Sequence, residues 1–341
     1  MEQTTIRDVA RKSGYSVATV SRVLSGSNYP VAAETREAIE RCARDLGYVP
    51  NMLARSLKTN MNTEVAVVIP SFLNPFYTTV LTGIERILTS NGFSMLVYLR
   101  KREAGADELI RSLHSKLVSG IIIAADCIDN SLAQKLLEIQ DRNIAVIVFD
   151  NAVAGYEQLR GVFFDYHRGG CMAAKYLFSH GHRQVALISK LIDRDTRKNF
   201  ANGFTSIYSK ENFALQDEDV YESLIEDDFF AGIELANAVL DSSKPYTAIA
   251  ANNDSVAAGA LSAMLQRGVR VPDDISIIGM DDNIYARMTT PLLTTVQIPS
   301  LEMGGLAARH LIDAVRGTSM RYNIYMQSDI IERNTVCNIN K

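Results

Sequence analysis

The sequence has few of the residues and motifs on which catalysis, metal binding and disulfide formation depend. Its cysteines are widely separated, no two of them have the spacing of metal ligands, and they number only four: Cys42, Cys127, Cys171 and Cys337. This pattern predicts free thiols in a reducing compartment. The five histidines show no Ser/His/Asp or metal-binding arrangement, and no glycine-rich phosphate loop is present. We therefore expect neither an enzyme nor a bound metal or cofactor.

The sequence also lacks a signal peptide and any apolar run of membrane-spanning length. Met1 leads directly into polar residues, so we expect a cytoplasmic protein. A chain of 341 residues is too long for one typical core and predicts about two or three domains.

Positive charge is slightly outnumbered, with 35 Lys or Arg against 39 Asp or Glu, but its distribution is informative. The net charge is −4, yet residues 1–60 hold nine Lys or Arg and six Asp or Glu, a net charge of +3. The rest of the chain has a net charge of −7. A basic segment joined to an acidic body directs affinity for nucleic acid to one end of the molecule.

The most informative segment is TIRDVARKSGYSVATVSRVLSG, residues 5–26, which predicts two short helices joined by a tight turn. Thr5 is placed to cap the first helix, Gly14 permits the turn, and Ser16 can cap the second helix. One face of the second helix is small, hydroxylated or cationic, with Val17, Ala18, Thr19, Ser21 and Arg22. Such a face is typical of a helix-turn-helix motif that enters the major groove. The alternative is an ordinary helical hairpin.

The match extends beyond this motif. Residues 31–48 predict a third amphipathic helix, and VPNMLARSLKTN follows at 49–60. The strings T-I-x-D-V-A, V-A-T-V-S-R-V-L and L-G-Y-x-P-N-x-x-A-R-S-L resemble the DNA-binding headpiece and hinge of the lactose/galactose repressor (LacI/GalR) family of bacterial transcription regulators. The resemblance implies an all-α headpiece over 1–48, a hinge over 49–61 and a regulatory core over 62–341.

Members of this family read base edges with the second helix. The resemblance therefore assigns base contacts to Val17, Ala18 and Arg22, and Arg22 can bond a guanine through two donors. Among the further candidate DNA-contacting residues, the hydroxyl side chains suit phosphates or helix capping, and the loop residues suit phosphates or a base edge: Thr5, Ser16, Thr19, Ser21, Asn28 and Tyr29.

The hinge string predicts one or two turns of helix that are too short to be stable alone in water. Family hinges fold when two copies pair over the minor groove, where a leucine wedges between central base pairs. Leu57 is the matching residue, Ala54 is small enough for close helix approach, and Lys58 completes the candidate contacts. The alternative is that Leu57 packs on the body.

After the hinge, apolar strands such as EVAVVIP (64–70) and ISIIGMDD (275–282) alternate with helices such as 254–266. This pattern predicts parallel sheets covered by helices on both faces. The two successive α/β units resemble the periplasmic-binding-protein fold. We expect an N-subdomain over about 62–160 plus 292–321 and a C-subdomain over about 161–291 plus 322–340.

A cleft between the two subdomains should hold a small molecule, because the C-terminal ends of the strands face it. The resemblance places Asp150, Asn253 and Asp281 there, and Phe76 or Tyr77 could supply a stacking wall. The alternatives are capping of the following helix or turn for the polar residues and a core position for one aromatic ring.

Two candidate effector residues depart from the family pattern. Phe200 stands where many sugar-responsive members carry an arginine, and Asp227 stands where an aromatic residue is frequent. These changes disfavour a sugar phosphate unless Arg194, Arg197 or Lys198 turns into the cleft. A neutral sugar, a sugar-derived polyol and a cationic or amine-bearing ligand stay open.

The sequence as a whole predicts a homodimeric DNA-binding regulator, most often a repressor, that binds a palindromic operator in the bacterial nucleoid and responds to a sugar-like effector. In one alternative, a phosphorylated carrier protein docks on the core and replaces the small molecule. In the other, the chain is a solute-binding protein without DNA function. Whether the effector induces or co-represses is not predicted.

Overall fold

The computed structural model describes residues 4–24, 30–48, 62–100, 105–142, 144–318 and 322–340. The chain divides into two units, Met1–Asn62 and Thr63–Lys341. Each unit has a hydrophobic core of its own.

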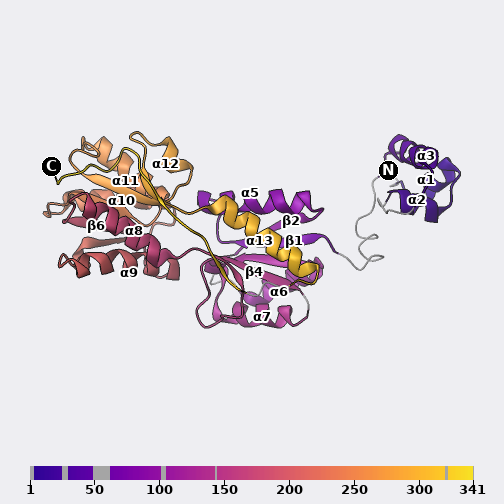
Figure 1. Cartoon of the computed structure of the whole chain (residues 1–341), viewed down its shortest axis with the longest axis horizontal. Helices are drawn as coiled ribbons and strands as arrows, with labels where there is room; N and C mark the ends of the chain where they lie inside the picture. Colours follow the sequence, from indigo (N-terminus) through magenta and orange to yellow (C-terminus); the bar gives the residue numbers. More distant parts are fainter. Residues whose placement is uncertain are drawn as a thin grey trace. The chain divides into compact units, whose positions relative to one another are not determined.

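The first unit contains three helices, α1 (Ile6–Ser13), α2 (Val17–Leu24) and α3 (Ala33–Asp45) (Figure 1). Gly14 ends α1 with a φ of 75°, the left-handed conformation that glycine adopts without strain. All three helices contribute to one small core, formed by Val9, Ala10, Val20, Val23, Ile39 and Ala43. The predicted helix-turn-helix and third helix are confirmed, although α3 is shorter at both ends than the predicted 31–48.

The second unit contains two subdomains, each built on a six-stranded sheet. The first sheet has the order β11-β5-β4-β3-β1-β2 and is parallel throughout. Its strands are β1 (Glu64–Ile69), β2 (Ser94–Leu99), β3 (Gly120–Ala124), β4 (Ala145–Asp150), β5 (Gly161–Phe163) and β11 (Ile324–Tyr325). The helices of this subdomain are α5 (Pro75–Ser90), α6 (Ala106–Ser115), α7 (Asn130–Gln140) and α13 (Ser300–Val315), with a 3-10 turn at Ala125–Cys127.

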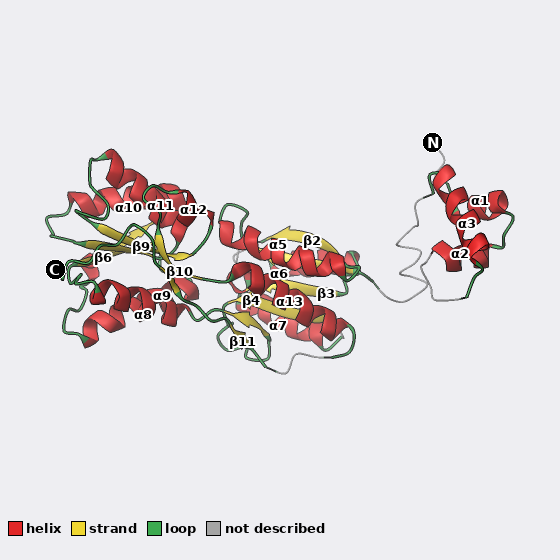
Figure 2. Cartoon of the chain, turned by 45° about the horizontal axis from the view of Figure 1, so that its top comes forward, coloured by secondary structure: helices red, strands yellow, loops and turns green. Residues whose placement is uncertain are grey.

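The second sheet has the order β12-β10-β9-β8-β6-β7, and only β12 is antiparallel to its neighbour. Its strands are β6 (Val185–Lys190), β7 (Val220–Ser223), β8 (Ala248–Ala251), β9 (Ser276–Asp281), β10 (Thr294–Gln297) and β12 (Ile330–Ile331). Figure 2 shows α10, α11 and α12 on one face of this sheet and α8 and α9 on the other. These helices are α8 (Tyr166–Ser179), α9 (Asp195–Lys210), α10 (Asp228–Asp241), α11 (Asp254–Gln266) and α12 (Ile284–Met288), with a 3-10 turn at Asp217–Asp219.

The two sheets have equivalent strand orders, so β4 in the first occupies the place of β9 in the second. Both strands are apolar runs that end in an aspartate, Asp150 and Asp281. Such runs form central strands because helices on both faces remove their side chains from water. The parallel direction places both carboxyl ends at the same edge of their sheets.

The predicted subdomain boundaries are wrong in three places. β5 begins at residue 161 but pairs with β4 of the first sheet, and β11, at 324–325, pairs with β5. β10, at 294–297, pairs with β9 of the second sheet. The chain therefore passes between the subdomains after β5, between β10 and α13, and between β11 and β12. An apolar strand pattern does not specify which of two similar sheets a strand joins, so these crossings could not be placed from the sequence.

Candidate nucleic-acid interface and effector cleft

The helix α2 has one buried and one exposed side. Val20 and Val23 lie in the core of the first unit, whereas Val17 is 44% exposed and Ala18 and Arg22 are also exposed. The outward side therefore carries two small apolar groups and one guanidinium, as predicted for a face that reads base edges. Its contacts with bases stay a prediction.

Several hydroxyl groups of the first unit have structural partners at helix ends. Ser16 Oγ accepts a hydrogen bond from the Thr19 backbone N–H at 3.1 Å, and the two hydroxyl oxygens lie 2.9 Å apart. The Thr5 N–H and hydroxyl both donate to the carboxylate of Asp8, which lowers the pKa of Asp8. Ser21 is half-buried. The predicted capping by Ser16 is confirmed, and phosphate contacts of these hydroxyls stay a prediction.

Five predicted DNA-contacting residues lie outside the described residues: Asn28, Tyr29, Ala54, Leu57 and Lys58. The same holds for the hinge over 49–61. Its pairing and its leucine wedge stay predictions.

The second unit has a cavity of about 750 Å³ lined by residues of both subdomains. Seven of the eight predicted effector residues line it: Phe76, Tyr77, Asp150, Arg194, Asp227, Asn253 and Asp281. The carboxyl ends of the central strands thus meet at the cavity, as the α/β architecture requires.

Asp150 and Asp281 line this cavity from the ends of β4 and β9. They are 2% and 5% exposed, and both have positive φ angles, 86° and 122°, which strain a residue other than glycine. Burial, followed by the charge of Asp126, raises the pKa of Asp150 to about 8. Burial, followed by the charges of Asp254 and Asp150, holds the pKa of Asp281 well above its ordinary value. The Tyr166 hydroxyl donates to Asp150.

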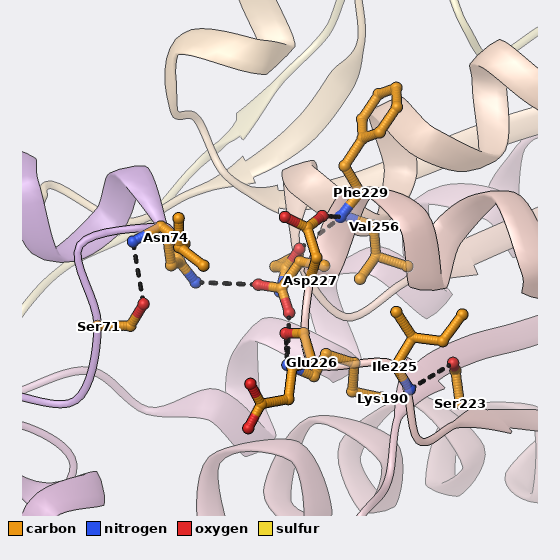
Figure 3. A network of polar contacts seen from close by, with 12 residues as sticks. Ser71, Asn74, Lys190, Ser223, Ile225, Glu226, Asp227, Phe229 and Val256 are labelled. Carbon is orange, nitrogen blue, oxygen red and sulfur yellow. Dashed lines mark hydrogen bonds and ion pairs between the residues drawn. The ribbon is translucent and has the colours of Figure 1, made fainter. Parts of the chain in front are cut away.

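The side chains of Asn253 and Asp227 cap helices as well as line the cavity. Asn253 Oδ1 accepts from the Val256 N–H at 2.8 Å at the start of α11. Asp227 accepts from the N–H groups of Phe229 and Phe230 at 2.9 and 3.1 Å at the start of α10 (Figure 3). The capping alternative is therefore confirmed for Asn253. The carboxylate of Asp227 already accepts two backbone hydrogen bonds, so it stabilises the start of α10.

Phe76 and Tyr77, at the start of α5, line the cavity and also belong to the hydrophobic core. Their rings meet edge to face with centroids 5.1 Å apart, and Tyr77 packs in the same manner on Phe149. Both side chains are buried, and both line the cavity. Their rings are thus fixed by packing at the edge of the cavity, and stacking of a ligand on them stays a prediction.

The prediction that Phe200 faces the cleft is wrong. Its side chain is 1% exposed, stacks on Phe204 with a centroid distance of 6.3 Å, and does not line the cavity. The cause is the close packing of α8 against α9, since a Cβ on Gly170 would lie 2.1 Å from the Phe200 carbonyl oxygen. Because of this contact, the side of α9 that carries Phe200 faces the hydrophobic core. Arg194 and Arg197, at the start of the helix, line the cavity instead.

The cations at the cavity have neighbouring partners. Lys190 lies 3.2 Å from the Asp228 carboxylate and donates to the Glu226 carbonyl (Figure 3). Arg197 donates to the Leu191 carbonyl at 2.8 Å and to Asp193 at 3.2 Å. Arg194 donates to the Asp126 carbonyl at 3.4 Å and lies 3.8 Å from Asp193.

Sequence reasoning missed several polar lining residues: Asn74, Asp126, Lys190, Asp228, Asn252 and Ser255. A signal was present for Asn252 and Ser255, which lie within two residues of Asn253 in the string that follows β8. No local pattern indicates that Asn74 and Asp228 approach each other.

Neither a metal centre nor a membrane helix is found in the residues that the structure describes. No group of three or more His, Cys, Asp or Glu side chains is placed to hold a metal ion. No helix in the same residues is long and apolar enough to cross a bilayer. A helix-turn-helix unit followed by two sheets around a polar cavity defines a ligand-responsive DNA-binding regulator.

Comparisons with known proteins agree with this class. Residues 5–51 match the family described as "Bacterial regulatory proteins, lacI family", and residues 174–336 match a periplasmic binding protein-like domain. The repressor PurR of Vibrio campbellii is 30% identical over 345 residues, which cover 98% of this chain and 99% of that protein. The chain therefore belongs to the lacI family of bacterial regulatory proteins and is a DNA-binding transcriptional regulator, as its sequence predicted.

Further relatives also match over nearly the whole length of this chain. The ribose operon repressor of Haemophilus influenzae is 29% identical, with 93% of this chain and 94% of that protein covered. A solved complex of the regulator CelR with cellobiose is 26% identical, with a TM-score of 0.71 and coverage of 98% and 100%. The Lac repressor dimer bound to operator and an anti-inducer has a TM-score of 0.85, with coverage of 98% and 100%; at 24% identity it shows the shared fold.

Proposed function

We propose that this regulator is a homodimeric repressor whose affinity for a palindromic operator is set by a small molecule in the cleft. The observation that carries the proposal is the joint occurrence of an outward-facing α2 and a cavity lined by both subdomains. Relatives named as a PurR repressor and a ribose operon repressor support repression rather than activation.

The DNA-binding step rests on two copies of α2. Two-fold symmetry of a dimer matches two half-sites of a palindrome. In each half-site Arg22 donates to a guanine, and Val17 and Ala18 contact apolar groups such as thymine methyls. The hydroxyls at the start of α2 are suited to contacts with phosphates, because the N–H groups of a helix N-terminus favour anions.

The regulatory step rests on the cleft. A ligand that contacts both subdomains stabilises one relative arrangement of them over another. It shifts the operator equilibrium only by its difference in affinity for the two arrangements. Structures of relatives that hold cellobiose and ribose support a sugar-like effector, and hydroxyl groups suit the carboxylate and amide lining of this cavity.

The experiment is a gel shift of the full chain with genomic fragments at about 50 and 200 mM salt, followed by selection of the bound sequences. We expect one palindromic sequence to be enriched and its affinity to fall steeply with salt. Binding of all fragments with equal affinity would overturn the proposal.

Control by a phosphorylated carrier protein is the second candidate for the regulatory step. The exposed side of α13 carries Arg309, a residue suited to a phosphate group. If the phosphorylated carrier, and no small molecule, changes operator affinity, this candidate replaces the effector in the cleft. An Arg309→Ala variant then loses the response.

A further inference from the structure

The inner wall of the cavity is rich in hydrogen-bond acceptors. Asp150 and Asp281 reach it from equivalent strand ends of the two sheets. Asn252 and Ser255, which follow β8, line it as well and are 6% and 3% exposed. Within the described residues, Asn252 Oδ1 and Ser255 Oγ have no hydrogen-bond partner. Buried polar atoms without partners are costly, so their presence around one cavity points to a ligand with hydrogen-bonding groups, among them a donor for Asn252 Oδ1.

The two carboxyls have neutral partners in the protein. Asp150 accepts from the hydroxyl of Tyr166, and Asp281 accepts from the Asn283 amide at 3.4 Å. In the described part of the chain, neither carboxyl is bonded to a lysine or arginine.

Among the described residues, three cations line the same cavity, and each has a partner other than Asp150 and Asp281. Lys190 pairs with Asp228, Arg197 pairs with Asp193, and Arg194 donates to the Asp126 carbonyl and lies 3.8 Å from Asp193. The charged neighbours that act most strongly on Asp281 are the carboxylates of Asp254, Asp150 and Asp228, all of which disfavour its ionised form. Asp281 therefore lies among carboxylates that disfavour its ionised form, and a cationic group of a ligand would favour that form.

We propose that the effector carries a cationic amino group bound between Asp150 and Asp281, next to hydroxyl groups that donate to Asn252 and Ser255. An amino sugar is the simplest molecule of this class. The inference rests on the proposed function, in which this cavity is the effector site.

Backbone geometry supports a ligand role for the two aspartates. Both adopt left-handed φ angles at the ends of their strands, and strain of this kind is retained where the fold or a site requires it. Asparagine tolerates that region as well as aspartate does. Asp→Asn variants therefore remove the charge without adding strain.

The test compares matched ligands on the full-length protein. The probes are glucosamine, galactosamine and mannosamine, each beside its neutral parent sugar and its N-acetyl derivative. Thermal shift finds the binders, and calorimetry in two buffers of different ionisation heat measures affinity and proton release. We expect one amine to bind about tenfold tighter than its neutral parent, because a charged donor strengthens hydrogen bonds to carboxylates. Its binding should release protons as the carboxyls ionise.

The variants separate a ligand role from a structural one. We expect Asp281→Asn to raise the melting temperature of the ligand-free protein and to reduce affinity for the amine about tenfold, with little effect on a neutral sugar. Asp150→Asn is the second variant, and Asp273→Asn, in an exposed turn before β9, is the control. If both cleft variants lower the melting temperature, the carboxyls are structural and the inference is overturned.

The outcomes of the ligand panel distinguish the two proposals. If a neutral sugar binds as tightly as its amine, or tighter, the inference fails while small-molecule control stands. If no amine, sugar, polyol or nucleobase binds, control through the cleft fails and the inference fails with it. If an amine binds with proton release and alters the gel shift, both stand.

Discussion

Asn74 Nδ2 donates a 3.4 Å hydrogen bond to Asp228 Oδ2, and the two residues belong to different subdomains (Figure 3). Asn74 also caps α5 through its Oδ1, which accepts from the Phe76 N–H at 2.9 Å. Asp228 receives a second amide donor from Asn253 at 3.1 Å and pairs with Lys190. The start of α5 is thus joined across the cavity to the starts of α10 and α11.

Replacement of Asn74 by aspartate tests this connection. The variant keeps an oxygen that caps α5 but places a second carboxylate beside Asp228, so the bond is replaced by repulsion. We expect effector affinity to fall about fivefold, or about 1 kcal/mol, as for loss of one hydrogen bond. Calorimetric titration measures it. Asn74→Ser, which can still cap α5, should show a smaller loss; equal affinity of all three proteins would contradict a role for the bond.

Substitution of Arg22 tests base reading by α2. Arg22→Ala should reduce the preference for the operator over a sequence with the contacted guanine replaced by about 1–3 kcal/mol. Competition binding with the two DNA sequences gives this value. Arg41 on α3 is exposed and pairs with Glu37 at 3.2 Å, so Arg41→Ala is a matched loss of charge. An equal loss of preference in both variants would show that Arg22 acts only as a charge.

Stability of the core should depend on pH through the buried carboxyls. Asp150 has a folded pKa of about 8, whereas an unfolded aspartate titrates near pH 4. Between these values the folded protein binds more protons than the unfolded chain, so the free energy of unfolding falls as pH rises. Each such carboxyl contributes up to about 1.4 kcal/mol per pH unit.

Denaturant unfolding between pH 5 and pH 8 measures this slope. Asp254, whose pKa burial also raises to about 8, contributes in the same direction. Asp150→Asn should reduce the slope by the contribution of one carboxyl, up to about 1.4 kcal/mol per pH unit. A slope unchanged in this variant would show that Asp150 is ionised in the folded protein.

The packing of α8 on α9 predicts a difference between two helical glycines. A Cβ on Gly203 would lie 2.0 Å from the His167 carbonyl oxygen, whereas the nearest atom to a Cβ on Gly305 is 3.6 Å away. We expect Gly203→Ala to destabilise the protein by about 1–3 kcal/mol because the helices must separate. Gly305→Ala should be neutral or stabilising, since alanine favours helix. Thermal unfolding of the two variants gives the comparison.

The sequence was sufficient for elements whose pattern is strong and local. The helix over 254–266 has the predicted bounds, and β4 and β9 lie where apolar runs end in Asp150 and Asp281. The family resemblance placed both aspartates at the cavity, and the rule that parallel strands face a cleft with their carboxyl ends agrees with it. The bounds of these elements needed only local patterns, whereas the cleft needed the resemblance to the family.

The remaining features depend on contacts between distant segments. Whether Phe200 faces the cleft or the core is decided by the approach of α9 to Gly170 on α8. The bond between Asn74 and Asp228 joins residues 154 positions apart. The crossings that assign β5 and β10 to opposite sheets follow from pairing between similar strands. None of these leaves a periodic pattern in the chain.

The central claim is that the cleft controls how tightly α2 holds its operator. Fluorescence anisotropy titration of the selected operator with the full chain, with and without the bound amine, tests it most directly. We predict that the amine changes the operator Kd at least about tenfold, within the range of coupling free energies known for allosteric proteins, and that Asp281→Asn abolishes the change. An operator Kd that is the same with and without a ligand shown to occupy the cleft would contradict the claim.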